Sequence, residues 1–259
     1  MNILDTIIAK KIQEVAENKI EKPIAVLENR PPITWVCKPF ATAIANPNKK
    51  GIIAEIKFKS PSKGIINSSD NVSEIAKGYQ SAGASCLSVL TDVDFFGGSN
   101  VNLIFAHLAS SLPIIKKDFI IDEYQIIESK SIGADAILLI ASILTPKKCL
   151  ELANFAKSFG LNILLELHNE SELHFINQHI DAVGVNNRNL KTFEVSLNNA
   201  EALAKKIPNN FIKVAESGID SVEAYNTLKS FGYQGFLMGE YFMKHKNPGE
   251  ACATFINSL

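Results

Sequence analysis

A glutamate and a lysine stand two residues apart inside an otherwise apolar run near residue 55. The run reads Ile52-Ile53-Ala54-Glu55-Ile56-Lys57-Phe58, a composition typical of a buried β-strand. Alternate residues of a strand share a face, so Glu55 and Lys57 point the same way as Ile53. Burying a lone charge costs several kcal/mol, so both need a partner, water or a ligand. The spacing indicates either an internal ion pair or a chemical site.

More acids, bases and amides stand at the ends of later apolar runs. They are Lys117, Glu166, Asn186, Arg188, Glu216 and Ser217. One glutamate in a strand is more often an ion-pair member than a catalyst, but so many polar residues at successive strand ends are hard to explain as packing. Together they offer general acids, general bases and anion ligands. Lys116 points away from Lys117, and we expect it to reach solvent or a helix.

The elements that must position these residues alternate along the chain. Eight apolar runs, each suited to a parallel strand, lie at 52–58, 86–91, 113–119, 136–141, 162–167, 182–186, 212–215 and 235–239. Between them, Ser73 and Thr145-Pro146 are typical of helix starts. The glycines at 83, 133, 160 and 232 are expected at left-handed helix ends.

Eight βα units in one chain predict an α/β fold, a (β/α)8 TIM barrel, with functional residues at the C-terminal strand ends. An open doubly wound sheet is the alternative, but the G-x-G-x-x-G turn that it usually carries is absent. Residues 1–50 do not fit the repeat, because helical spacing from Ile3 to Val15 precedes four prolines. We expect one barrel domain over 1–259, with 1–50 as an N-terminal helix and arm and 51–259 as the eight units.

Composition excludes several function classes. The chain has 259 residues, 46% of them hydrophobic, and a formal net charge of −1 without a basic run. We therefore expect neither a nucleic-acid nor an anionic-membrane partner. Four scattered cysteines without a C-x-x-C pair favour a reducing compartment, the cytoplasm, over a disulfide frame or a structural zinc. The longest apolar stretch, 136–144, is too short to span a bilayer.

The turns after the last two strand candidates are typical of phosphate sites. Ser217-Gly218 and Gly239 place glycines and free backbone N–H groups where barrels of this class commonly bind phosphate. Glycine after a strand is also ordinary turn chemistry, so the two turns together favour phosphate more than either alone. Lys59 and Lys63 stand on a nearby loop and could assist.

Several motifs together resemble one known family. They are Ala54-Glu55-Ile56-Lys57 with Ser60-Pro61-Ser62, Leu90-Thr91-Asp92 with Phe95-Phe96-Gly97-Gly98, Lys117-Asp118-Phe119-Ile120, Leu165-Glu166, Gly184-Val185-Asn186-Asn187-Arg188, Ala215-Glu216-Ser217-Gly218 and Met238-Gly239. With them the chain resembles indole-3-glycerol phosphate synthase over nearly its whole length. The resemblance implies ring closure, decarboxylation and dehydration of 1-(2-carboxyphenylamino)-1-deoxyribulose 5-phosphate, a step of tryptophan biosynthesis. It implies a small phosphorylated substrate, no cofactor, no metal and no fused isomerase domain, and we favour a monomer.

The resemblance also implies roles for individual residues. Lys117 is expected to be the general acid of ring closure and Glu166 a general base. Lys57 binds the substrate carboxylate or serves as a second acid, and Glu55 orients or deprotonates. Which lysine donates which proton stays open, since nearby acids and cations shift a lysine pKa in opposite directions.

The remaining site residues are expected to bind or position the substrate. Asn186 and Glu216 suit hydroxyls and Arg188 a carboxylate, and the other binding residues are Ser60, Phe96, Phe119, Ser217, Gly218 and Gly239. Two positions depart from the family pattern: Glu240 replaces a common serine, and Asn189 a common aspartate. The rival functions are another phosphate-binding barrel, such as a phosphoribosyl isomerase or an aldolase, and a catalytically silent barrel.

Overall fold

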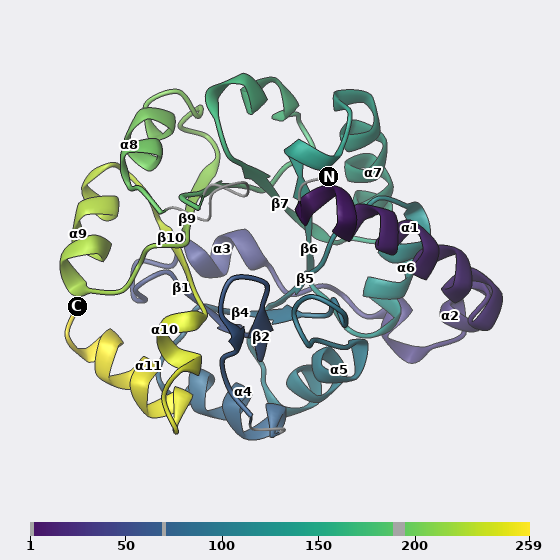
Figure 1. Cartoon of the computed structure of the whole chain (residues 1–259), viewed down its shortest axis with the longest axis horizontal. Helices are drawn as coiled ribbons and strands as arrows, with labels where there is room; N and C mark the ends of the chain where they lie inside the picture. The colour runs from purple at the N-terminus through teal and green to yellow at the C-terminus, as the bar shows by residue number, and fades with distance from the viewer. Residues whose placement is uncertain (1–2, 69–70, 189–194) are drawn as a thin grey trace.

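The chain folds around a closed barrel of eight parallel strands, as predicted. The computed structural model describes residues 3–68, 71–188 and 195–259. Around the barrel the strands follow the order β1-β10-β9-β8-β7-β6-β5-β4 (Figure 1). Their bounds are β1 Ile52–Ile56, β4 Cys86–Leu90, β5 Ile114–Lys117, β6 Ala136–Ile140, β7 Asn162–Leu167, β8 Ala182–Asn186, β9 Ile212–Glu216 and β10 Gly235–Met238.

Strand alternation decides which side chains enter the barrel. One parity fills the interior with apolar residues, among them Ile53, Ile115 and Leu164. The other parity packs against the surrounding helices, as Ile52 does. Glu55 therefore continues the interior series of its strand, and the interior changes from apolar to charged towards the C-terminal strand ends.

Lys116 shows the opposite parity and never reaches the interior. It is buried, and its ammonium lies 2.7 Å from Glu128 of helix α6. Of the two expectations for this residue, the helix contact is confirmed and solvent is wrong. A buried ammonium needs such a partner to offset its lost hydration.

Helices cover the outside of the barrel. They are α4 Val72–Ser81, α5 Asn100–Ala109, α6 Glu123–Ser131, α7 Pro146–Ser158, α8 Asn198–Ala204, α9 Val222–Ser230, α10 Glu240–Met243 and α11 Pro248–Asn257, with the 3-10 turn η2 at Ala141–Ile143. The Thr145 cap is confirmed, but α4 is capped by Asn71 and not by Ser73. Between β7 and β8, the described residues form only a 3-10 helix, η3 Glu170–Phe175. No helix among the described residues is long and apolar enough to cross a membrane.

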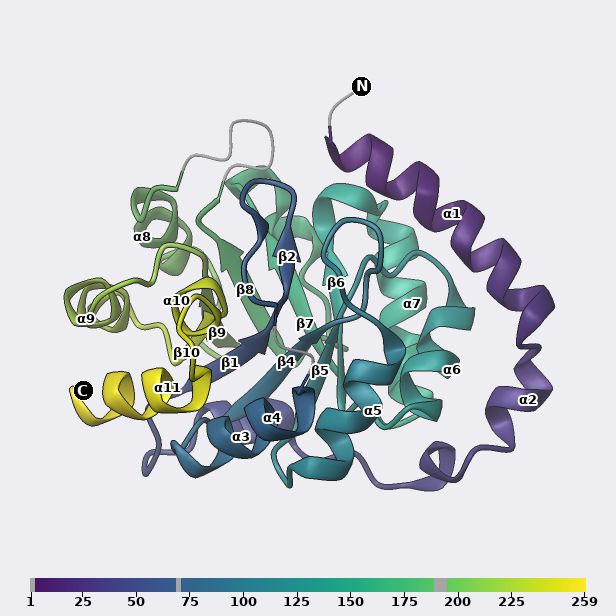
Figure 2. The same cartoon turned by 60° about the horizontal axis from the view of Figure 1, so that its bottom comes forward.

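The predicted N-terminal helix is longer than expected and is followed by a partly helical arm. The elements are α1 Ile3–Glu21, α2 Ile24–Glu28, the 3-10 turn η1 Pro31–Thr34 and α3 Phe40–Ile44. In Figure 2, α1 and α2 run down the outside of α6, and α3 closes the lower end of the barrel. Phe40 and Ile44 of α3 join the interior cluster, which explains why this end is apolar.

A small hairpin rises at the opposite end. Strands β2 Lys59–Ser60 and β3 Gly64–Ile65 pair antiparallel directly after β1. The sequence pattern predicted only a loop here, since two-residue strands carry no readable periodicity. The hairpin stands over the C-terminal ends of the barrel strands, beside α10.

Candidate active site

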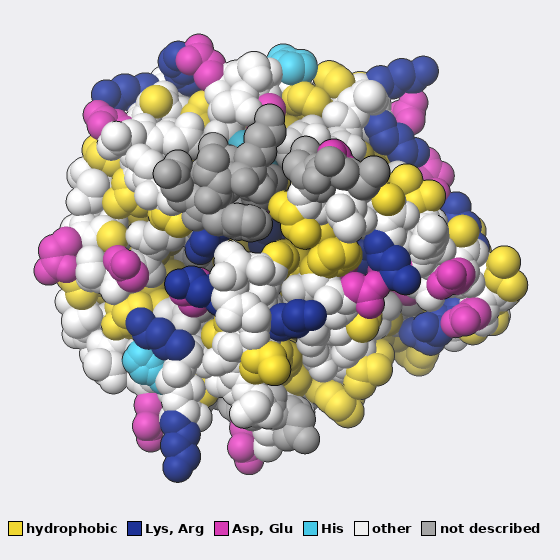
Figure 3. Space-filling view, in the orientation of Figure 1, with side chains coloured by type: hydrophobic (Ala, Val, Ile, Leu, Met, Phe, Trp, Pro, Cys, Tyr) yellow, Lys and Arg dark blue, Asp and Glu magenta, His cyan; other side chains and the backbone are white. Residues whose placement is uncertain are grey.

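A cavity of about 680 Å³ opens at the C-terminal end of the barrel. Figure 3 shows lysine and arginine side chains around the hollow at its centre. All the site residues expected from the sequence line it: Glu55, Lys57, Ser60, Phe96, Lys117, Phe119, Glu166, Asn186, Arg188, Glu216, Ser217, Gly218 and Gly239. Lys63 lines it too, whereas Lys59 does not and donates to the backbone oxygen of Asp94. Asn189 lies outside the described residues.

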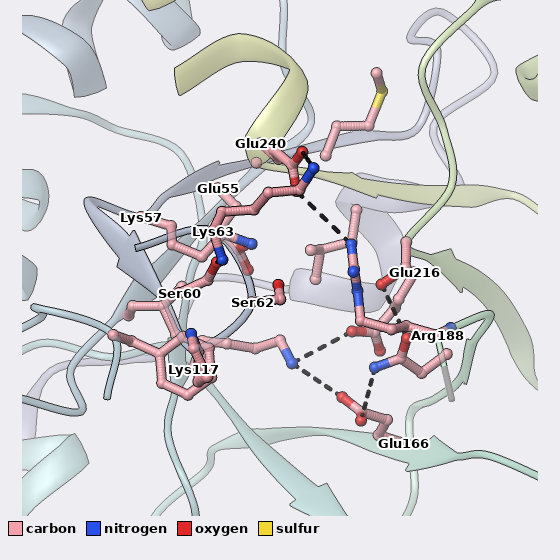
Figure 4. A pocket seen from close by; sticks show the side chains of 18 of the residues that line it. Glu55, Lys57, Ser60, Ser62, Lys63, Lys117, Glu166, Arg188, Glu216 and Glu240 are labelled. Carbon is pink, nitrogen blue, oxygen red and sulfur yellow. Dashed lines mark hydrogen bonds and ion pairs between the residues drawn. The ribbon is translucent and has the colours of Figure 1, made fainter. Parts of the chain in front are cut away.

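Lys117 of β5 reaches the centre of this cavity (Figure 4). Its ammonium lies 2.9 Å from Oε2 of Glu166 and 3.3 Å from Oε2 of Glu216. Burial by itself lowers the lysine pKa, but attraction to Glu166, Glu216 and Glu55 outweighs burial and raises the pKa. The residue therefore carries its proton at neutral pH, as a general acid must.

The two carboxylates around Lys117 titrate in opposite directions. Burial raises the pKa of both. For Glu166, attraction to Lys117 and contact with His168 reverse that effect and hold the pKa well below its usual range. For Glu216, burial dominates and repulsion from Glu166 adds to it, which raises the pKa to about 8. At neutral pH the pair thus holds one ionised and one protonated carboxyl, an arrangement common where acid and base roles are divided.

Asn186 links three of the site residues. Its amide Nδ2 donates to Oε1 of Glu166 at 3.1 Å, and its Oδ1 accepts from Ser217 Oγ at 2.9 Å and from the backbone N–H of Arg188 at 3.0 Å. These three hydrogen bonds together fix the orientation of the Asn186 amide, because its nitrogen can only donate and its oxygen can only accept. Because the Ser217 hydroxyl is engaged here, an anion at this turn would be bound by backbone N–H groups.

Ser217 has a backbone φ of +66°, and among the described residues no other non-glycine has a positive φ. A side chain costs about 1–2 kcal/mol in this region. Such strain collects at functional sites, where surrounding contacts hold it in place. Here Asn187 supports the turn by donating to the Ser217 carbonyl oxygen at 3.1 Å.

The Glu55 carboxylate and the Lys57 ammonium lie 2.9 Å apart. The two residues therefore form an internal ion pair within the candidate site, and both interpretations of their spacing in the sequence hold. Ser88 also donates to Glu55, at 3.2 Å. Gly239 leaves room for this carboxylate, because a Cβ there would lie 2.5 Å from Glu55 Oε1. Gly184 does the same for Glu216, with 2.3 Å to Oε1. The two glycines therefore have a steric role that sequence reasoning did not assign to them.

Apolar side chains form one wall of the cavity. Phe96 and Phe119 lie with ring centroids 5.9 Å apart, and both are half-buried. Helix α1 contributes Ile3, Leu4 and Ile7 to the same cavity. The resemblance implied that this helix closes over the site but did not single out these three as wall residues, since nothing in their pattern distinguishes a wall residue from an ordinary apolar helix face.

The rim carries an acid between two bases. Glu240, at the start of α10, lies 3.8 Å from the Lys63 ammonium and 3.7 Å from the Arg188 guanidinium. All three side chains are partly exposed, so these contacts are weak. They place the Glu240 carboxylate between two cations.

Comparison with known proteins identifies the family. Residues 4–255 match the model of the indole-3-glycerol phosphate synthase family. A curated protein of that name from Bacteroides thetaiotaomicron is 45% identical over 258 residues, which cover 100% of this chain and 99% of the relative. The chain belongs to the indole-3-glycerol phosphate synthase family. The resemblance read from the motifs is thereby confirmed.

Solved structures of lower identity share the fold. A tryptophan synthase α-subunit from Legionella pneumophila aligns with a TM-score of 0.62 at 15% identity, covering 85% of this chain and 94% of that one. An N-acetylmannosamine-6-phosphate 2-epimerase from Clostridium perfringens gives 0.62 at 14% identity, covering 86% and 97%. At such identities these likenesses concern the barrel and not the chemistry.

Proposed function

We propose that this chain, a carboxy-lyase of tryptophan biosynthesis, forms indole-3-glycerol phosphate from 1-(2-carboxyphenylamino)-1-deoxyribulose 5-phosphate with Lys117 as the acid of ring closure. The observation that carries the assignment is a partly buried, protonated Lys117 within 3.3 Å of both Glu166 and Glu216 in a member of this family. Ring closure needs a proton donor at the substrate's ketone oxygen, and Lys117 is the ammonium at the centre of the cavity.

Substrate binding follows from the charges around the cavity. The phosphate is bound by backbone N–H groups at Ser217, Gly218 and Gly239, where two strands end in glycine turns. Phe96 and Phe119 bind the aromatic ring of the substrate. Their half-buried phenyl rings support this assignment. Bidentate guanidinium geometry suits a carboxylate, so Arg188 binds the carboxyl group of the substrate.

The reaction then proceeds in three steps. The ring carbon that bears the carboxylate attacks the ketone carbon, and Lys117 transfers its proton to the ketone oxygen. Carbon dioxide leaves, and its bonding electrons restore the aromatic ring. The new hydroxyl leaves as water with a proton from Lys57, the second ammonium of the site, and Glu166 takes a proton from the adjacent carbon of the new ring. Glu55, 2.9 Å from Lys57, orients that lysine.

Substituting the proposed acid and base tests these roles. We expect Lys117→Ala and Glu166→Gln each to lower kcat by about 10²–10⁴-fold, the usual contribution of one general acid or base. Indole fluorescence follows product formation, and circular dichroism checks folding. Lys147→Ala is the control, since that side chain is 89% exposed and does not line the cavity. Near-normal turnover in either site variant would refute its assignment.

We further propose that the protein acts in the cytoplasm as a monomer. The support is the set of four free cysteines, three of them buried as ordinary core residues. Light scattering on the purified protein should give a mass near 28.3 kDa. Twice that mass at micromolar concentration would reject the monomer.

A further inference from the structure

His168 lies directly behind Glu166 and does not line the cavity. It follows β7 two residues after Glu166, on the same face of the strand. Its Nε2 is 3.0 Å from Glu166 Oε1, and its Nδ1 is 3.7 Å from Glu172 Oε2. The side chain is only 12% exposed. The imidazole thus stands between a carboxylate of the site and a carboxylate outside it.

The backbone around His168 is held by the same groups. Its N–H donates to Glu172 Oε2 at 2.6 Å, and its carbonyl oxygen accepts from Asn199 of α8 at 2.9 Å. Asn169 donates to the other oxygen of Glu172 at 3.0 Å. Glu172 is therefore a fixed anion and not a mobile surface side chain.

The imidazole of His168 interacts with Glu166 and Glu172 mainly by electrostatic attraction and less by aligned hydrogen bonds. Neither ring nitrogen makes a well-aligned hydrogen bond within the described structure. Burial lowers the pKa of His168, but contact with Glu166 and Glu172 outweighs burial and raises the pKa to about 10. The ring is therefore an imidazolium at neutral pH.

Glu166 depends on two cations, and the reaction removes one of them. In the resting site its carboxylate contacts Lys117, Asn186 and His168. After Lys117 has given its proton to the substrate, the imidazolium is the one cation among the described residues that still lies at contact distance from Glu166. A carboxylate that loses its cations in a buried site takes up a proton and ceases to be a base.

We propose that His168 is a positioning residue, whose imidazolium bridges Glu166 and Glu172 and keeps Glu166 ionised and correctly directed after Lys117 has donated its proton. The proposal rests on the role proposed above for Glu166. The described charged groups that face this bridge are Glu166 from β7, Glu172 from η3 and, through Glu166, Lys117 from β5. From β8 and α8 it meets only the amides of Asn186 and Asn199.

The test is the pH profile of kcat for His168→Gln, which keeps an amide donor but no charge. Loss of the cation raises the Glu166 pKa, so the acidic limb of the kcat profile should shift to higher pH by about one unit or more. At pH 7 we expect kcat to fall about tenfold with KM changed less than about twofold, the pattern of a lost transition-state contribution. His174→Gln is the matched control, because that exposed histidine lies on η3, the 3-10 helix that carries Glu172.

Glu172→Gln provides a second variant. Without Glu172, the His168 pKa falls, so kcat should decline at alkaline pH where the ring loses its proton, while the acidic limb stays near that of the wild type. Thermal unfolding of each variant reports folding, and a folded Glu172→Gln decides the question if His168→Gln does not fold.

The outcomes separate the two proposals. If the wild-type enzyme is active and the acidic limb of the His168→Gln profile is not shifted, the proposed role of His168 is overturned. This holds whether kcat of the variant is normal or is equally reduced at all pH values. Equal pH profiles for Glu172→Gln and the wild type would overturn it as well. A wild type that forms no indole product would instead reject the proposed function.

Discussion

Lys117 sits among more negative charge than it can neutralise. Glu55, Glu166 and Glu216 all stabilise its ammonium, and burial together with repulsion from Glu166 keeps a proton on Glu216, so the excess negative charge is neutralised there. Gly184 is what allows Glu216 to lie so deep, since any side chain there would meet Oε1. At the scale of the residue, the site is a set of carboxyl groups with different proton affinities around one acid.

The raised pKa of Glu216 predicts a pH-dependent cost to folding. Its folded pKa of about 8 exceeds the ordinary value of 4.5, so the folded state keeps a proton that the unfolded state has lost. Stability from this group is present at low pH and declines as pH rises from about 4.5 to 8. The decline is at most about 1.4 kcal/mol per pH unit.

Glu216→Gln removes this dependence, because an amide does not ionise. We expect the free energy of unfolding of the variant to increase relative to that of the wild type between pH 5 and pH 8, because only the wild type loses stability as pH rises. Urea unfolding at both pH values measures it. Curves for the two proteins that stay parallel across this range would contradict the raised pKa.

The sequence predicted the polar site residues because strand parity and strand ends are both readable. Glu166 and His168 also share a parity, so an E-x-H pattern was available as a signal for the histidine. Glu172, by contrast, approaches through a 3-10 turn that no periodicity predicts. The division of protons between Glu166 and Glu216 depends on burial and on 3 Å distances, which a sequence does not contain.

At the scale of elements, helix α1 is attached through a buried lysine. Lys11 is 1% exposed, and its ammonium lies 2.8 Å from Glu14, 3.1 Å from Asp92 and 2.9 Å from Asp118. Asp92 follows β4 and Asp118 follows Lys117. The helix is thus joined to the strand ends that carry the site.

Lys11→Met should therefore destabilise the protein by about 3–5 kcal/mol, because it leaves Asp92 buried without this cation and Asp118 with the more distant Lys116, at 3.7 Å. Lys10→Met is the matched control: Lys10 pairs with Asp94 at 3.5 Å, with both side chains 50% exposed. A surface pair of this kind contributes about 0–1 kcal/mol. Urea unfolding compares them, and equal losses in both variants would show that the Lys11 cluster stabilises no more than a surface pair.

Element boundaries were predictable where local chemistry sets them. The glycines at 83, 133, 160 and 232 all have positive φ, as expected for left-handed helix ends. Ser73 was wrong as a cap because Asn71, two residues earlier, accepts from the Glu74 N–H, and both residue types cap well. An N-terminal helix lying on the barrel was expected, but the contacts that attach α1 were beyond sequence reasoning, since they depend on side chains about a hundred residues away.

At the scale of the whole molecule, the barrel closes where its first strand meets its last. β1 pairs with β10, and the Phe236 N–H donates to the Gly51 carbonyl oxygen at 2.9 Å. Gly51 has a φ of +71°, and a Cβ there would lie 1.9 Å from the Gln234 oxygen. The strand count that predicted a barrel could not reveal how tightly this seam is packed.

Gly51→Ala should open the seam. A Cβ at Gly83, where φ is +92° and nothing lies within 4 Å, meets only the cost of the left-handed backbone, about 1–2 kcal/mol. At Gly51 the backbone clash adds about 3 kcal/mol more. Chemical unfolding of Gly51→Ala and Gly83→Ala measures the difference, and similar losses would mean that the seam relaxes without cost.

The attachment of α1 has a consequence for the order in which the protein becomes functional. Helix α1 is made first, yet its partners arrive much later: Lys19, for example, pairs with Asp122, 103 residues further along. Contacts so distant in sequence form late, after the intervening chain has folded. Since α1 supplies Ile3, Leu4 and Ile7 to the cavity, we expect the folding chain to form the charged barrel mouth before it gains the apolar wall for an aromatic ring. Substrate affinity is thus among the last properties that the folding chain acquires.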